Sequence, residues 1–277
     1  MGSFNSITSS IFDPILGLFG DVSAWIDILF WSILGGVVAL LVYKHISNQD
    51  GIAKAKNDIK VHLMEIRLFQ DDLFGVVLST AKILLKNLLY IGHNVMPMIV
   101  MFVPMMTILF QLEANYAFDP IEPGNTVTLS VTLDPEATDA RGRDVEIELP
   151  EGLELVASSK GRPDGAVFRI RADQPSEQDY EILLRADGVE EAKGLAVGGG
   201  HRKVPYIRTK SLEAFLYPGE PALAGSSPFQ EIRFGIDDIP ARDLGWLPGG
   251  EGGILMVFFV LSIVAGLALK GVFGVTL

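Results

Sequence analysis

The sequence predicts an α-helical membrane protein with three transmembrane helices, joined to an all-β domain of immunoglobulin-like type. The chain has 277 residues and a mean hydropathy of +0.35, although 20% of its residues are charged. Its apolar residues must therefore be concentrated in segments. The charge is segregated as well. Between Ala114 and Gly252 there are 25 acidic and 14 basic residues, a net charge of −11 out of −12 for the whole chain.

Three apolar segments are long enough to cross a bilayer whose hydrocarbon core is roughly 30 Å thick. They cover residues 22–43, 94–113 and 253–271. Trp25 and Tyr43 lie near the two ends of the first segment, where interfacial aromatic residues are common, and Lys270 lies at the end of the third. Gly35 and Gly36 in the first segment would allow another helix to approach closely. We expect each segment to form a transmembrane helix.

Two further segments are expected to be helical without crossing the membrane. Residues 1–21 include a short apolar stretch that is typical of an amphipathic helix lying at the interface. Residues 44–93 begin as a charged helical coil and continue as an apolar helix. This helix carries Lys82 and Lys86 one turn apart, so it should be polar along one stripe only.

The distribution of basic residues predicts the orientation in the membrane. Seven Lys or Arg residues lie between residues 44 and 94, and none lies before residue 44. Positive residues in short loops favour the cytosolic side. We therefore expect the N-terminus outside, residues 44–93 in the cytosol, the acidic domain outside and the C-terminus in the cytosol. This arrangement describes a multi-pass protein of a plasma membrane, namely a bacterial inner membrane.

Residues 119–246 show the patterns of a β domain. Apolar and polar residues alternate in five short segments, at 126–133, 144–149, 166–171, 180–185 and 230–234. Proline and glycine motifs such as those at 122–125 and 149–152 separate them and indicate turns. Short strands at this spacing predict an immunoglobulin-like sandwich.

Composition and motifs argue against an enzyme. The chain contains no cysteine, so it has neither disulfides nor thiolate metal sites, and its four histidines are not spaced as metal ligands. No serine lies in a nucleophile-elbow motif, and no catalytic set emerges. We therefore expect no catalytic residue, metal or cofactor. The acidic balance also argues against nucleic acid as the main partner.

An ionisable residue, Asp27, lies inside the first predicted span. Placing such a group at hydrocarbon depth costs roughly 2 to 3 kcal/mol, so it tends to line a hydrated cavity. The alternative is a span that begins at Ile28, which would leave Asp27 among the lipid headgroups.

The second predicted span has unusual composition. Pro97 and Pro104 each remove a helical hydrogen bond, although Pro97 would be harmless in the first turn. The span also holds five of the eight methionines: Met96, Met98, Met101, Met105 and Met106. Methionine is flexible and polarizable, which suits a surface that accepts many apolar shapes. The alternative is that these methionines simply face lipid.

Taken together, these segments resemble the YidC/Oxa-type membrane protein insertases. The stretch 12–19 resembles the outer amphipathic helix of that family, 43–63 resembles the exit from its first core span into a cytosolic coil, and 94–106 resembles the entry to its second core span. The resemblance covers residues 10–113 and, more loosely, 253–275. No arginine lies between Asp27 and Lys44, and the β domain follows the second span, so the three-span archaeal and endoplasmic-reticulum branch is most similar.

The resemblance implies a groove that is open to the cytosol and eases the entry of hydrophobic protein segments into the bilayer. The residues that it would involve are Asp27, Ser32, Lys44, His93, Asn94, Met98, Met101 and Met105. It also implies that Lys54, Lys56 and Lys60 capture the client segment or contact a ribosome or translocase. The expected partners are thus the lipid bilayer and hydrophobic protein segments.

A second interpretation belongs to another class of protein. The chain could be a membrane-anchored envelope scaffold whose acidic β domain binds a protein partner outside, with the spans acting only as anchors. It could equally be one subunit of a larger membrane complex.

Overall fold

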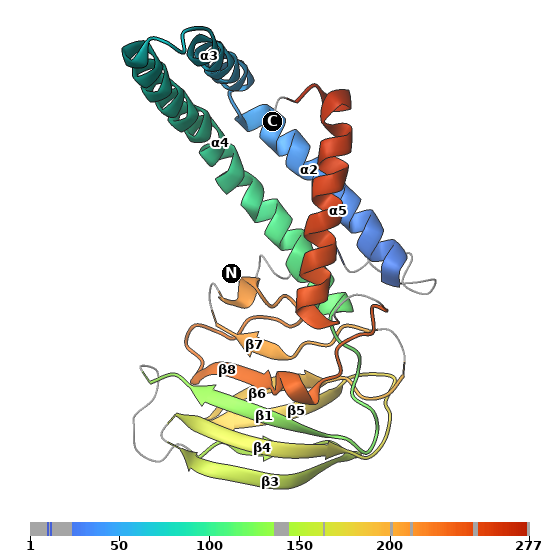
Figure 1. Cartoon of the computed structure of the whole chain (residues 1–277). Coiled ribbons are helices and arrows are strands. Elements are labelled where there is room, and N and C mark those ends of the chain that lie inside the picture. Colours follow the sequence, from blue (N-terminus) through green and yellow to red (C-terminus); the bar gives the residue numbers. More distant parts are fainter. Residues whose placement is uncertain are drawn as a thin grey trace. The chain divides into compact units, whose positions relative to one another are not determined.

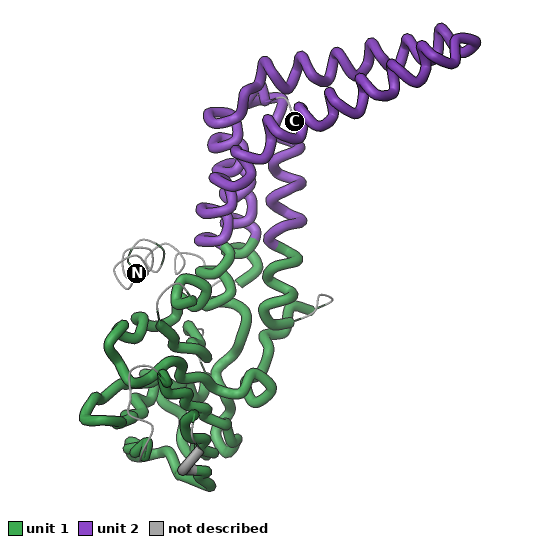
Figure 2. Tube along the Cα trace, turned by 90° about the vertical axis from the view of Figure 1, so that its left-hand side faces the viewer, with its two compact units in different colours: residues 1–28, 109–257 green, residues 29–108, 258–277 purple. Residues whose placement is uncertain are grey.

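The structure is a computed structural model of the chain, and it describes residues 10, 12, 24–135, 144–162, 164–199, 202–210, 213–245 and 249–275. The predicted interfacial helix over 1–21 lies outside the described residues, apart from Ser10 and Phe12. The chain divides into two compact units. One consists of Met1–Ile28 and Leu109–Val257, the other of Leu29–Ile108 and Phe258–Leu277, shown in green and purple in Figure 2. They are called the β unit and the helical unit below.

Among the residues that the structure describes, three helices have the length and composition of membrane spans. These are α2 (Ala24–Ile46), α4 (Leu73–Tyr116) and α5 (Gly250–Phe273). They match the three predicted apolar segments, which confirms these segments as helices long and apolar enough to cross a membrane. The chain therefore has the build of a multi-pass membrane protein with an added β domain.

The segment expected as a coil plus a separate amphipathic helix forms a helical hairpin. Its first arm is α3 (Gln49–Leu68), which begins where the Asn48 side chain accepts a hydrogen bond from Gly51 N at 2.9 Å. Its second arm is the first part of α4. There is no break at residue 93, because α4 continues as one helix of 44 residues through Pro97 and Pro104.

Small residues bring α2 and α5 together in the helical unit. A Cβ atom on Gly36 would lie only 2.6 Å from the backbone oxygen of Ser262. The Ser262 hydroxyl donates a hydrogen bond to the carbonyl oxygen of Ser32 at 2.8 Å. The predicted role of the glycine pair in close helix packing is thus observed, with Phe258 and Ser262 of α5 packed against the two glycines.

The β unit holds two antiparallel sheets (Figure 1). The first has the order β3-β4-β1-β8-β7 and the second the order β2-β5-β6. The strands are β1 (Thr126–Leu133), β2 (Glu146–Glu148), β3 (Leu153–Arg162), β4 (Gly165–Ala172), β5 (Tyr180–Ala186), β6 (Val189–Leu195), β7 (Ile207–Thr209) and β8 (Phe229–Phe234).

The five strands predicted from alternation are present as β1, β2, β4, β5 and β8. The prediction missed β3, β6 and β7. The sequence of β6, Val-Glu-Glu-Ala-Lys-Gly-Leu, does not alternate in the usual way, because a buried lysine takes a core position. The immunoglobulin-like arrangement stays a prediction.

The core of the β unit follows the alternation of its strands. In β1, the side chains of Val127, Leu129, Val131 and Leu133 are buried and the intervening ones are not fully buried. Lys193 of β6 joins the two sheets. Its ammonium group lies 4.9 Å from the ring centroid of Phe234 in β8 and donates to Glu220 Oε2 and to the carbonyl of Pro205, each at 2.5 Å.

Candidate functional site

The helical unit contains a groove of about 700 Å³ between α2, α4 and α5. Most of its lining is apolar and comes from α4. The lining residues are Ala39, Leu40 and Tyr43 of α2, Tyr90, Ile91, Asn94, Val95, Met98, Met101, Phe102, Met105 and Met106 of α4, and Phe259, Ser262, Ile263 and Leu267 of α5. This volume lies in the range of pockets that hold a ligand of drug size.

Polar groups gather at one end of this groove. The Tyr43 hydroxyl donates a hydrogen bond to Asn94 Oδ1, and Asn94 Nδ2 donates to the carbonyl of Tyr90 at 2.6 Å. Tyr43 also packs in a small core with Leu40, Ile52 and Val275. The side chain of Asn94 is therefore held between α2 and its own helix, and the rest of the groove presents mainly hydrocarbon and thioether surface.

Four of the predicted groove residues come together here, namely Asn94, Met98, Met101 and Met105. They follow one another at spacings of four, three and four residues, so they share one face of α4. This face is the one that α4 turns toward the groove.

Three other predicted groove residues do not line it. Ser32 is fully buried where α2 meets α5, and Lys44 is exposed just after Tyr43. His93 is turned toward α3, since its Nε2 atom lies 3.1 Å from where a Cβ on Gly51 would be. The groove is consequently more apolar than the hydrated recess that the resemblance implied.

Asp27 belongs to the β unit rather than to the groove. Its side chain is fully buried, and its Oδ2 atom accepts a hydrogen bond from the Tyr116 hydroxyl at 2.5 Å. The Arg242 guanidinium lies 5.9 Å from the centre of the Tyr116 ring and 2.8 Å from Asp119. Protein side chains therefore cover Asp27, and its placement in a hydrated cavity or among the lipid headgroups stays a prediction.

The three lysines predicted to capture a client all lie on α3 of the hairpin. Lys54 and Lys60 retain contact with solvent. Lys56 places its ammonium group 5.7 Å from the ring centroid of Tyr90, so it helps to hold α3 against α4. A role in capture stays a prediction for all three.

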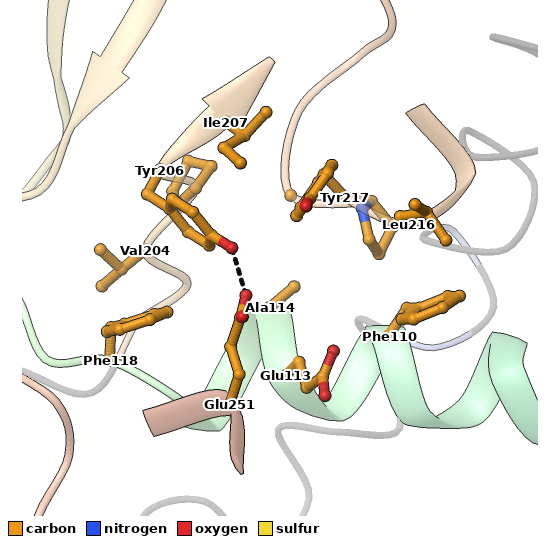
Figure 3. A pocket seen from close by; sticks show the side chains of 13 residues that line it. Phe110, Glu113, Ala114, Phe118, Val204, Tyr206, Ile207, Leu216, Tyr217 and Glu251 are labelled. Atoms are coloured by element: carbon orange, nitrogen blue, oxygen red, sulfur yellow. Dashed lines mark hydrogen bonds between the residues drawn. The ribbon is translucent and has the colours of Figure 1, made fainter. Parts of the chain in front are cut away.

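A second, smaller pocket lies in the β unit, and no pattern in the sequence pointed to it (Figure 3). Its volume of about 20 Å³ has room for one water-sized group. Phe118 and Tyr206 stack edge to face with ring centroids 5.2 Å apart, and Tyr206 and Tyr217 do so at 5.7 Å. Glu113 and Glu251 also line the pocket, and the Tyr206 hydroxyl donates a hydrogen bond to Glu251.

The two tyrosines of this pocket remain neutral at ordinary pH. Burial, followed by the hydrogen bond to Glu251, raises the pKa of Tyr206 well above its usual value. Burial and then the negative charge of Glu251 raise the pKa of Tyr217. Both hydroxyl groups are therefore donors rather than phenolates, and they lie with the two glutamates in a small aromatic enclosure.

Within the described ranges, no three His, Asp or Glu side chains gather closely enough to hold a metal ion. Comparison of the chain with known proteins finds no matching family model, no matching curated protein and no matching solved structure.

Proposed function

We propose that the protein is a membrane protein insertase or chaperone of YidC/Oxa type that receives hydrophobic segments of client proteins in the groove between α2, α4 and α5. The observation that carries this proposal is the groove itself. It combines a volume of about 700 Å³ with an apolar lining that includes Met98, Met101, Met105 and Met106. A groove of this kind suits a ligand defined by its hydrophobicity rather than by one shape.

Methionine side chains support this use. They have several rotatable bonds and a polarizable sulfur atom, so they adapt to differently shaped apolar groups. The polar end formed by Tyr43, Tyr90 and Asn94 would provide hydrogen-bonding groups to the flank of a client helix. A backbone group left without such a partner in hydrocarbon costs several kcal/mol. The groove would thereby lower the barrier to entry without any chemical step.

The proposed orientation follows from the basic residues between 44 and 94. It places the α3–α4 hairpin and the polar end of the groove on the cytosolic side of a bacterial inner membrane, and an immunoglobulin-like β domain on the outer side. Lys54, Lys56 and Lys60 would then meet the emerging client, a ribosome or a translocase.

The test uses purified full-length protein in liposomes and a client with one apolar segment and a short tail. Met98 and Met96 form a matched pair, because they are 57% and 61% exposed but only Met98 lines the groove. We expect Met98→Trp, which fills the groove, to reduce insertion several-fold and Met96→Trp to leave it unchanged. Equal effects of the two substitutions, or insertion that does not depend on the protein, would contradict the proposal.

A second candidate function is an envelope scaffold, and the pocket in Figure 3 favours it. Aromatic faces beside Glu113 and Glu251 would suit the ammonium group of a partner's lysine. A scaffold would lose its function on deletion of residues 119–246, and Met98→Trp would leave it active. An insertase should instead remain active after this deletion and lose activity with Met98→Trp. The two variants therefore distinguish the two functions.

A further inference from the structure

Polar side chains hold the two arms of the α3–α4 hairpin together. The Lys86 ammonium lies 2.7 Å from Asp58 Oδ2, and the Ser79 hydroxyl donates to Glu65 Oε2 at 3.0 Å. The α4 residues on this side follow the spacing of a helix pair, and they are half-buried or buried: Val76, Ser79, Ile83, Lys86 and Tyr90. The contact between the two arms therefore combines these two polar interactions with apolar side chains of α4.

The opposite side of α4 is apolar and uncovered. We call this side the outer face, and it is formed by Phe74, Leu78, Leu85, Leu89, Met96 and Val103. Each of these side chains is between 46% and 77% exposed. At the hairpin turn, Leu68 and Leu73 are 77% and 80% exposed. A hairpin fully surrounded by water would present mainly polar residues on such an exposed face, so this apolar surface calls for an apolar neighbour.

The outer face is continuous with the part of α4 that corresponds to the second predicted span. It runs from Phe74 to Val103 without a charged residue among its members. At 1.5 Å per residue this stretch is about 45 Å long, whereas the hydrocarbon core of a bilayer measures roughly 30 Å. This apolar surface is therefore longer than a membrane span, and the additional part belongs to the hairpin.

The hairpin is also inclined to the other helices of the helical unit. Figure 2 shows it leaning sharply away from the remaining helices of the purple unit. A helix pair that leans in this way, while keeping one apolar face, matches an element lying along the membrane surface. Lys82 is exposed at the edge of the outer face, four residues after Leu78, where its long side chain can reach the headgroups.

We propose that the outer face of the hairpin, from Phe74 to Leu89, lies in the boundary between lipid headgroups and acyl chains of the membrane that α4 crosses. Lipid is the occupant because the same surface, without interruption, continues into the span. This contact would hold the hairpin at the bilayer and fix its position beside the spans. It does not depend on any client, and therefore stands apart from the insertase proposal.

The experiment exploits the absence of cysteine from the chain. Single variants Phe74→Cys and Leu85→Cys place one fluorescent label on the outer face of the full-length protein in liposomes. Because these side chains are already 77% and 59% exposed, the substitutions remove little packing. Met96→Cys serves as the reference within the span, and Lys54→Cys, on the exposed polar side of α3, serves as the aqueous reference.

We expect quenchers attached to lipid acyl chains to quench the labels at residues 74, 85 and 96, and dissolved iodide to quench only the label at residue 54. Iodide quenching at residues 74 and 85, with no effect of the lipid quencher, would overturn the proposal. Shielding of these two labels only after a client polypeptide is added would assign the face to a protein partner and would likewise overturn it. Unchanged thermal unfolding of each variant confirms that its fold is intact.

Discussion

The β unit and the α3–α4 hairpin each pair a lysine with a carboxylate, but they differ in how deeply the pair is buried and in where their apolar residues lie. In the β unit, Lys193 is fully buried against Glu220, and the surrounding strands turn apolar residues inward. In the hairpin, Lys86 pairs with Asp58 between the two arms, where both side chains are about one-third exposed, and the outer face of α4 leaves large apolar residues exposed. The first arrangement is typical of a domain in water, and the second agrees with the proposed contact of the hairpin with lipid.

The comparison indicates that the effect of an ion pair on stability depends more on how deeply the pair is buried than on its N–O distance. Both pairs have short N–O distances, 2.5 Å for Lys193–Glu220 and 2.7 Å for Lys86–Asp58. Burial lowers the pKa of Lys193, although the charge of Glu220 opposes this effect. A buried pair depends on both partners, because removing one leaves an uncompensated charge. A pair near solvent tolerates the loss of a partner, because water replaces it.

The largest effect is expected from the buried pair. Lys193→Met leaves Glu220 without its cation and should destabilise the β unit by about 3 to 5 kcal/mol. The measurement is denaturant unfolding of the full-length protein in detergent. Replacing both partners, as Lys193→Met with Glu220→Leu, should restore most of the loss. A single variant as stable as the natural chain would show that the β unit does not depend on this pair.

An intermediate effect is expected where helices of the helical unit meet. Gly36→Ala would place a Cβ atom 2.6 Å from a backbone oxygen that cannot move away easily, so α2 and α5 must separate. Overpacking of this kind costs about 1 to 3 kcal/mol. Gly266→Ala on α5 is the matched control, because no atom lies within 4 Å of its added Cβ. Thermal unfolding in detergent should shift downward for Gly36→Ala only.

The smallest effect is expected from acid pH on the hairpin seam. The hydrogen bond from Lys86 lowers the pKa of Asp58 below its ordinary value of 3.8, and the hydrogen bond from His62 does the same for Glu65. A lowered pKa in the folded state contributes stability that is present above the ordinary pKa and is lost as the pH falls through the folded value.

Hydrogen exchange in α3 should therefore speed up as the pH falls below about 4, after correction for the intrinsic rate. In the Asp58→Asn variant the acid-induced part should shrink, since an amide side chain at this position does not titrate. Acid-induced opening of the same size in this variant would show that Asp58 does not contribute to the seam.

Much of the local structure was predictable because it depends on periodicity. The apolar segments have the length of membrane spans, and alternation predicted β1 with the same bounds that the structure shows. Helical spacing also places Asn94, Met98, Met101 and Met105 on one face of α4, and this face does line the groove. Where a core position is taken by a polar residue, as with Lys193 in β6, the same reasoning missed the strand.

The sequence by itself therefore determined which segments are apolar helices, where the main strands lie and which residues share a face. Tertiary structure alone decided which neighbour each face meets. It placed the carbonyl oxygen of Ser32 against Ser262 of α5, enclosed Asp27 beside Tyr116, and brought Glu113, Tyr206 and Glu251 to one pocket from distant parts of the chain. The physical reason is that periodicity reports the geometry of one element, whereas a site depends on how several elements pack.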